Sequence, residues 1–236
     1  MFKQFILILF LLCSVSDFYA AAIPVYLGDE IVWIKKQNHG PGKAFIHLHQ
    51  NEKTALKAAY AVVQKQGGSV MTLVHHGGRN IVFRLNHQRY EFDPNRIFTK
   101  AGIKQTLKRH GSYSQAAHQQ VHQLATHIKA LLPQGKIIAV HNNQFYSMRE
   151  YYPGGALAKE AGALHLNHAH QSRNFYLVTR RKDYLRLKRL NFNSILQTVH
   201  PRDDGSLSVY LATRPYVNVE AGHGELALQM QMLRQA

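Results

Sequence analysis

Short apolar runs alternate with amphipathic stretches along most of the chain, and this alternation constrains the fold more than any other feature. Several runs have the length of a strand and end in polar residues, as at residues 44–49 (AFIHLH) and 136–141 (KIIAVH). The stretches between them place apolar residues at helical spacing. Such alternation is typical of the α/β class. We therefore predict one domain, built as an open mixed β-sheet flanked by helices.

The expected elements can be placed by residue range. Strands are predicted at 44–49, 69–75, 80–85, 88–92, 136–141, 174–179, 194–199, 206–211 and 216–220, and helices at 51–66, 112–132, 182–190 and 222–233. Gly67 and Gly68 stop the first helix, whereas Ser114 is a suitable N-cap for the second and Pro133 ends it. Polar residues just beyond the carboxyl ends of strands are where sites assemble in such sheets.

The N-terminus has the pattern of a signal peptide. Lys3 precedes an almost unbroken apolar run at residues 5–15, and Ala20 and Ala22 suit cleavage before Ile23. We therefore predict a signal peptide at residues 1–22, a domain at 23–236, and a periplasmic or secreted location. The single cysteine leaves with the signal, so the exported chain would have no disulfide. The alternative is an uncleaved membrane anchor, for which the run is short.

The charge balance points to an anionic partner. The chain has 29 Lys and Arg against 13 Asp and Glu, a formal net charge of +16. A field of this sign attracts polyanions, and for an exported protein we expect an anionic cell-wall polymer or lipid. The alternative is a solvated basic surface with no particular partner. The sequence has no RNA- or DNA-binding motif, so we expect no nucleic-acid partner, and we expect a monomer.

Three predicted strand ends carry residues that suit metal chemistry. His49 and Glu52 follow the strand at 44–49, His141 ends the strand at 136–141, and Glu220 ends the strand at 216–220. Hydrolytic zinc prefers three ligands from His, Glu or Asp, with one position left open. A His and a Glu three residues apart at a strand-to-helix junction can reach one ion, and a neighbouring strand can supply the third ligand. A further carboxylate can then act as a general base.

A fourth element, Asp93-Pro94-Asn95-Arg96-Ile97-Phe98, gives these residues a familiar order. The chain resembles the zinc carboxypeptidases and the related succinylglutamate desuccinylase and aspartoacylase group. These proteins have His-x-x-Glu, then Asp-x-Asn-Arg-x-Phe, then a lone His at a strand end, then a late Glu. The pair Asn51-Glu52 looks like the deacylase branch.

The resemblance implies a role for each matching residue. His49, Glu52 and His141 would bind zinc (Zn²⁺), Asn95 and Arg96 would hold a substrate carboxylate, and Glu220 would be the catalytic base. A planar guanidinium is also the natural clamp for a carboxylate on chemical grounds alone. We therefore expect an exported zinc hydrolase, a carboxypeptidase-like metallopeptidase that cleaves an amide bond next to a free carboxylate, with peptidoglycan peptides as the substrate.

Other readings stay open at this point. The enzyme alternatives are an N-acetylmuramoyl-L-alanine amidase and a small-molecule deacylase, and the non-enzymatic one is a basic polyanion-binding protein. Asp-Pro-Asn is good turn chemistry, so Asn95 and Arg96 can instead support a turn. Glu225 competes with Glu220 as the base. For His47 we favour packing or a hydrogen bond to Glu52.

Overall fold

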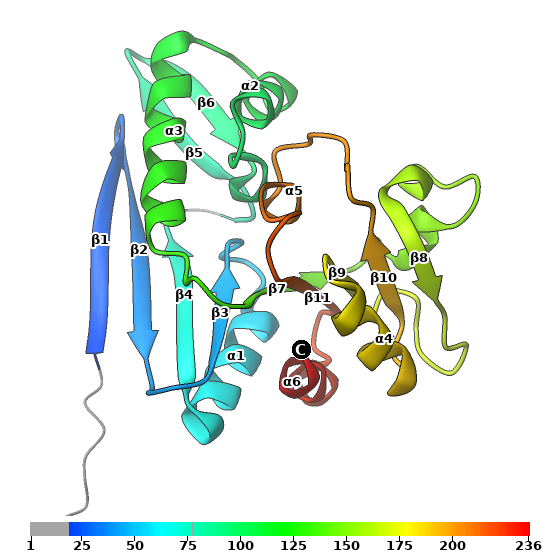
Figure 1. The fold of residues 1–236 in the computed structure, drawn as a ribbon. Coiled ribbons are helices and arrows are strands. Elements are labelled where there is room, and N and C mark those ends of the chain that lie inside the picture. The colour runs from blue at the N-terminus through cyan, green and yellow to red at the C-terminus, as the bar shows by residue number, and fades with distance from the viewer. Residues whose placement is uncertain (1–18, 77) are drawn as a thin grey trace, which may run out of the picture.

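The computed structural model describes residues 19–76 and 78–236 (Figure 1). The strands are β1 (Tyr19–Leu27), β2 (Glu30–Asn38), β3 (Lys43–His47), β4 (Gly68–Val74), β5 (Ile81–Leu85), β6 (Gln88–Phe92), β7 (Ile137–Asn143), β8 (Ala161–His165), β9 (Phe175–Val178), β10 (Ser194–Gln197) and β11 (Tyr216–Gly222). The helices are α1 (Lys53–Gln66), α2 (Lys100–Arg109), α3 (Gln115–Ala130), α4 (Arg181–Arg189), α5 (Leu207–Tyr210) and α6 (Leu226–Gln235), with 3-10 turns η1 (Pro94–Arg96), η2 (Met148–Tyr151) and η3 (Ala158–Glu160).

The main sheet has nine strands in the order β1-β2-β4-β3-β7-β11-β9-β10-β8. Its centre is parallel, because β4, β3, β7 and β11 run in one direction. On one side of the centre, β2 is antiparallel to β4 and β1 is antiparallel to β2. On the other side, β9 is antiparallel to β11, β10 is parallel to β9, and β8 is antiparallel to β10. Strands β5 and β6 form a separate hairpin. The predicted open mixed α/β sheet with flanking helices is therefore confirmed.

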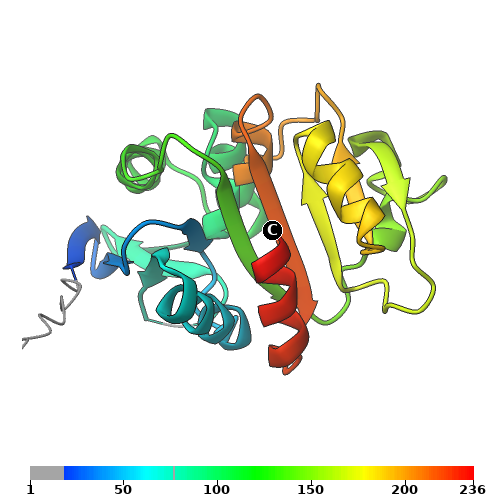
Figure 2. The same cartoon turned by 60° about the horizontal axis from the view of Figure 1, so that its bottom comes forward.

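Each face of the sheet has its own core. Helices α1, α4 and α6 cover one face, as Figure 2 shows, where they bury Val217, Val219 and Tyr176 among their apolar residues. On the other face, α2, α3 and the β5–β6 hairpin bury residues such as Phe98, Leu124 and Tyr216. The alternation along β11 therefore decides which side chains face α6 and which face the opposite side.

Most predicted elements occur where the sequence placed them. Helix α1 covers most of the range 51–66, and Ser114 caps α3 by accepting a hydrogen bond from the Ala117 N–H at 3.1 Å. Strand β7 runs two residues beyond the predicted end at His141, so His141 lies within the strand. None of the helices in the described ranges is long and apolar enough to span a bilayer.

The strand predicted at residues 206–211 is wrong. This segment forms the short helix α5, because Ser206 caps it: its hydroxyl accepts a hydrogen bond from the Val209 N–H at 3.4 Å. The Asp204 carboxylate in turn accepts one from the Ser206 N–H at 2.9 Å. Local side-chain capping therefore outweighs the alternating pattern of the sequence.

The structure adds elements that the sequence analysis did not place, namely the β1–β2 hairpin, α2 and β8. Of the predicted signal peptide, residues 1–18 lie outside the described residues. Its last residues, from Tyr19, belong to β1, where Ala22 is paired with Lys35. Cleavage before Ile23 would therefore shorten the edge strand of the sheet.

Candidate metal centre

The predicted ligands come together at the carboxyl ends of two neighbouring parallel strands. His49 follows β3, Glu52 is the residue before α1, and His141 lies in β7, which pairs with β3. The Glu52 backbone N–H donates to the His49 carbonyl at 2.9 Å, a tight turn that points both side chains the same way. The Asn142 side-chain oxygen accepts from the Ala55 N–H at 2.7 Å and so ties β7 to the start of α1.

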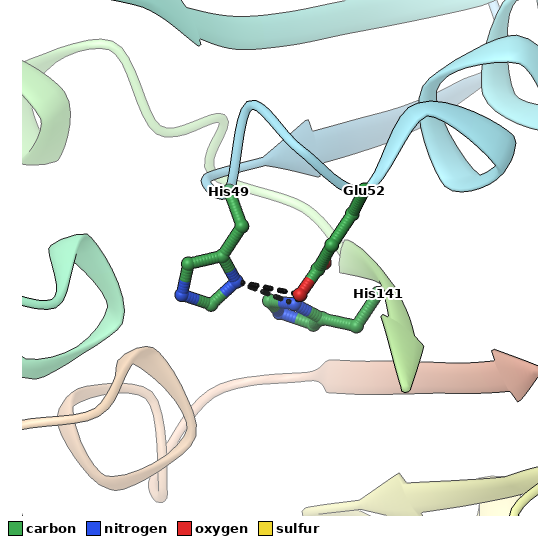
Figure 3. Close-up of side chains that lie close together, drawn as sticks. All are labelled: His49, Glu52 and His141. Atoms are coloured by element: carbon green, nitrogen blue, oxygen red, sulfur yellow. Dashed lines mark hydrogen bonds and ion pairs between the residues drawn. The ribbon is translucent and has the colours of Figure 1, made fainter. Parts of the chain in front are cut away.

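Their ligand atoms form a compact triangle (Figure 3). His49 Nδ1 lies 3.0 Å from Glu52 Oε1, His141 Nδ1 lies 2.9 Å from Glu52 Oε2, and the two Nδ1 atoms are 3.2 Å apart. All three side chains are buried, at 0, 1 and 3% exposed. Within residues 19–76 and 78–236, this is the one group of three or more His, Cys, Asp or Glu residues with ligand atoms close enough to share an ion.

These distances fit a tetrahedral zinc ion. Ligands at about 2.0–2.1 Å from such an ion lie roughly 3.3 Å from one another, which is close to the observed separation of the two nitrogens. When two imidazole nitrogens face each other at 3.2 Å, their lone pairs repel unless a proton or a cation lies between them. A metal ion satisfies both nitrogens and the carboxylate together. The donor set, two nitrogens and one carboxylate, suits zinc.

Asp93 fixes which nitrogen of His49 faces the ligand triangle. Asp93 Oδ1 accepts a hydrogen bond from His49 Nε2 at 2.8 Å, which leaves Nδ1 to point at Glu52 and His141. A carboxylate behind a ligating histidine is the usual device for orienting the ring and raising its basicity. Asp93 belongs to the Asp-x-Asn-Arg-x-Phe motif, but the sequence alone gave no role for it. The position of Asp93 at the start of the motif, two residues before Asn95, was the signal that could have indicated a role.

The charges of the triangle depend on one another. Burial alone would lower the pKa of His49, but the carboxylates of Glu52 and Asp93 raise it to about 9. Burial would raise the pKa of Glu52, but His49 and His141 hold it well below its usual value. The triangle therefore keeps its carboxylate ionised, as a metal ligand must be.

Two further residues support Glu52. His47 donates from Nε2 to the Glu52 carbonyl oxygen at 3.1 Å and contacts the Thr72 hydroxyl at 2.8 Å, which confirms the expected hydrogen bond to Glu52. Burial lowers the pKa of His47 to about 4, so this ring is neutral. Arg79, which the sequence analysis missed, places Nη1 2.5 Å from Glu52 Oε1 and Nη2 3.8 Å from Asp93 Oδ2.

Glu220 lines the same pocket as Glu52 and His141. In the parallel register of β7 and β11 it is the partner of His141, and its side chain is on the face opposite Val217 and Val219. Amide groups hold both of its oxygens. Asn218 Nδ2 donates to Oε1 and Asn143 Nδ2 to Oε2, each at 3.0 Å.

Glu225, the competing carboxylate, lies elsewhere. It precedes α6 and pairs with Arg173 at 2.5 Å and with the Asn174 amide at 2.7 Å. It is not among the residues that line the pocket, whereas Glu52, His141 and Glu220 are. Placement therefore favours Glu220 over Glu225 as the carboxylate that faces the triangle.

Asn95 and Arg96 also line this pocket. Asn95 has a structural role, because its Oδ1 accepts from the Leu207 N–H at 3.0 Å while its own N–H donates to Asp93 Oδ1 at 2.7 Å. Its amide N–H group is what it can offer a ligand. The Arg96 guanidinium donates to the Asn95 carbonyl at 3.0 Å and lies 3.6 Å from Asp204 Oδ2. The pair supports a turn and also faces the pocket.

The pocket extends from the triangle over the face of β11 and β9 towards β10. It encloses about 420 Å³, and its wall includes polar and aromatic side chains that the sequence did not single out. Tyr146 and Tyr151 stand near Glu220 with their hydroxyls hydrogen-bonded to each other. Burial first, and then the neighbouring Tyr151 and Glu220, hold the pKa of Tyr146 well above its usual value, so it stays a hydrogen-bond donor. Glu160, Gln197 and Asn218 also line the pocket.

Comparison with known proteins adds no relative. No protein-family model matches the chain, no curated protein matches it, and no solved structure matches its fold. The geometry of the site is therefore the only guide to function.

Proposed function

We propose that this protein is a zinc-dependent hydrolase that cleaves an amide bond next to a free carboxylate. The observation that carries the proposal is the buried triangle of His49 Nδ1, Glu52 and His141 Nδ1 with the carboxylate of Glu220 in the same pocket. Three N and O ligands together with a separate base are the components of a hydrolytic zinc site. A site that only stored metal would not need the separate carboxylate.

The protein residues divide the work of hydrolysis. Zinc held by His49, Glu52 and His141 would polarise the scissile carbonyl and make water a stronger acid. Glu220 accepts the proton of the attacking water as the C–O bond forms, and it then delivers that proton to the leaving nitrogen as the amide C–N bond breaks. Asn143 and Asn218 hold the Glu220 carboxylate in place for both transfers.

Cationic side chains in the pocket suit the charges of the substrate. Arg96 and the amide of Asn95 face the pocket and can bind a carboxylate by charge-assisted hydrogen bonds. Arg79 stands beside Glu52, where its second guanidinium nitrogen can stabilise the oxyanion that develops on the carbonyl. In this arrangement the scissile amide would bind at the metal beside Arg79, and the free carboxylate of the substrate would bind at Arg96 and Asn95.

The substrate class we propose is a short peptide of the cell wall, cleaved by a carboxypeptidase reaction. The predicted export of the chain and its formal charge of +16 support an anionic wall polymer as its surroundings. The polar pocket wall, with Glu160, Gln197 and Asn218, suits a terminal residue with hydrogen-bonding groups better than a large apolar one.

The test combines metal analysis with peptide hydrolysis. Protein purified without a His-tag is expected to hold one zinc ion per chain, and His49→Ala and His141→Ala are expected to lose it. The wild type is expected to cleave peptides with a free C-terminus and to spare the same peptides amidated at that end. Full zinc retention in both variants would refute the metal assignment, and equal cleavage of free and amidated peptides would refute the carboxylate clamp.

The alternatives give different results in the same assay. A muramoyl amidase would release the whole stem peptide from a muropeptide, and a small-molecule deacylase would cleave N-acyl amino acids but not peptides. A binding protein would keep its zinc and hydrolyse none of these substrates.

A further inference from the structure

The edge of the sheet opposite the metal centre is basic. The strand pairing places Lys43 level with Lys136, because the next residues, Ala44 and Ile137, are paired. Tyr216 also pairs with Ile137, so Pro215 lies at the same end of the strands. Val217 pairs with Val178 in the antiparallel direction, which places Pro215 level with Arg180. The ligand triangle lies at the carboxyl ends of β3 and β7, and these residues lie at the other ends. We call the set the basic edge; it consists of Lys43, Lys65, Lys136, Arg180, Arg181, Lys182, Arg214 and Arg234.

Few carboxylates offset these charges. In the described segments 36–43, 65–68, 129–136, 179–183, 212–216 and 231–236, which make up this edge, the only acidic side chain is Asp183. Asp183 pairs with Lys136 at 2.6 Å and lies 3.9 Å from Arg186. Five members of the basic edge are exposed, namely Lys65, Arg180, Arg181, Lys182 and Arg234.

Lys43 is a half-buried member of the basic edge. Its Nζ donates to the Leu233 carbonyl at 3.0 Å and also to the Arg234 carbonyl, which joins β3 to the end of α6. Burial, and then the charges of Arg186 and Lys136, lower the pKa of Lys43 to about 8. Burial is the larger cause, and Arg186 and Lys136 add to it, so Lys43 lies beside other positive charges.

The N-terminal sequence enters the fold at the same edge. Tyr19 pairs with Asn38 at the end of β2, and Asn38 pairs with Ser69 at the start of β4, next to Lys43. Figure 1 shows the start of β1 beside the end of β2. In the sequence, the apolar run at residues 5–15 ends a few residues before Tyr19. In the alternative in which this run is retained as a membrane anchor, a bilayer that takes it up would lie near the basic edge.

We propose that the basic edge binds the surface of a membrane rich in anionic phospholipid, with the metal centre facing away from it. Lipid phosphates supply the negative charge, and the Arg and Lys side chains supply charge-assisted hydrogen bonds to them. The proposal takes the alternative in which the apolar run stays attached: a membrane can take up that segment, whereas a soluble polymer offers it no apolar phase. The proposal does not depend on hydrolysis, because it concerns a different edge.

Vesicle sedimentation of the full chain tests the proposal. Vesicles of phosphatidylcholine measure the contribution of the apolar segment, and vesicles with about a third phosphatidylglycerol add the charge. We expect the partition coefficient to be at least tenfold higher on the anionic vesicles and to fall with salt, because surface charges are screened. Equal binding to both vesicle types would overturn the proposal.

Two charge-matched variants locate the effect. Arg180→Gln/Arg181→Gln/Lys182→Gln removes three exposed charges from the basic edge, and Lys104→Gln/Lys108→Gln/Arg109→Gln removes three from exposed positions on α2. At about fivefold per charge, the first is expected to lose about a hundredfold in binding to anionic vesicles and the second much less. Equal losses would show that net charge alone matters and would overturn the proposal.

A second edge variant and a soluble competitor complete the test. Lys65→Gln/Arg234→Gln removes exposed charges from other elements of the same edge and guards against local misfolding in the first variant. It is expected to lose binding as well, with an unchanged circular dichroism spectrum. Binding of the wild type to soluble polyphosphate with no preference for anionic over neutral vesicles would assign the edge to a polymer and overturn the membrane proposal.

Discussion

The hydrogen bonds of Glu220 make its replacement by glutamine informative. The side-chain oxygens of Asn143 and Asn218 are buried and without a partner in the described structure. If Glu220→Gln presents an amide N–H, Asn218 can rotate its amide and offer that oxygen, so the variant keeps the shape of the site. We expect zinc content and fold to survive while kcat falls by about 10²-fold or more, the scale of losing a general base. Steady-state kinetics on a free-C-terminal peptide would measure this.

Glu225→Gln is the matched control for Glu220→Gln. Its carboxylate pairs with Arg173 and Asn174 outside the pocket, so the change should leave kcat near the wild-type value. If Glu225→Gln abolishes turnover and Glu220→Gln does not, the base has been assigned to the wrong carboxylate. If neither variant changes hydrolysis, the proposed mechanism is wrong.

Replacing Arg96 tests the proposed carboxylate clamp. Arg96→Lys keeps the charge but loses the planar fork, so one charge-assisted hydrogen bond to the substrate carboxylate goes, about 1.5–3 kcal/mol. We expect kcat/KM for a free-C-terminal peptide to fall by about ten- to a hundredfold. Arg84→Lys, at an exposed position of β5, is the control. An Arg96→Lys enzyme with unchanged kcat/KM would leave the residue with only its contacts to Asn95 and Asp204.

Asp93 is expected to set metal affinity rather than turnover. Asp93→Asn preserves the size of the side chain but weakens the acceptor for His49 Nε2, so the ring loses basicity and its fixed orientation. We predict a zinc affinity lower by about ten- to a hundredfold. Competition with a coloured chelator measures it directly. An unchanged affinity would show that His49 is oriented by packing alone.

At the scale of elements, the position of Arg96 depends on a close contact between two glycines. A Cβ on Gly102 in α2 would lie 2.2 Å from the Gly205 Cα and 2.7 Å from the Arg96 carbonyl oxygen. The Phe98 N–H donates to the Gly205 carbonyl at 2.9 Å, so the segment after η1 is held against the loop before α5. Only glycine lets the helix approach this closely.

Gly102→Ala should therefore destabilise the protein, although replacing glycine by alanine usually stabilises a helix. In an exposed helix the exchange stabilises by up to about 1 kcal/mol. Here we expect a loss of about 1–3 kcal/mol from overpacking, together with a higher KM, because Arg96 is displaced. Urea unfolding and kinetics measure the two effects. Gly135→Ala, where a Cβ meets nothing within 4 Å, is the control. A stabilised Gly102→Ala protein with normal KM would contradict this reading.

The same elements show how far sequence alone reaches. The ligand triangle was predictable because His49, Glu52 and His141 stand at the ends of strands that periodicity identifies and that parallel pairing brings together. Arg79 was not, because it lies before β5, far in sequence from the residues it contacts. Helix α2 was not predicted because its buried face has only Ile103 and Leu107 as large apolar side chains. It packs against β6 and α3, and its Gly102 packs against a distant loop. Contacts of this kind depend on tertiary structure and leave no local period.

For the whole molecule, zinc bound at this site is expected to link distant segments of the chain and so to stabilise the fold. Its ligands come from the end of β3, the start of α1 and β7, so an ion at this place joins segments far apart in the sequence. Bound zinc would also offset the cost of keeping two buried imidazoles and a carboxylate together. Metal that binds the native state but not the unfolded chain stabilises the fold by mass action.

Thermal unfolding with and without zinc tests this coupling. At free zinc about a hundredfold above its Kd, the stabilisation is about 2.7 kcal/mol. A domain of this size shifts its Tm by about 2–4 °C per kcal/mol, so a strong chelator should lower the Tm by roughly 5–10 °C. His49→Ala should have a lower Tm that zinc no longer raises, whereas Glu220→Gln, which keeps all three ligands, should retain the full shift. The 16 histidines of the chain allow weak zinc binding elsewhere, but such sites would raise the Tm of His49→Ala as much as that of the wild type. An equal rise in both proteins would therefore place the stabilising ion outside the triangle and contradict the assignment of the metal centre.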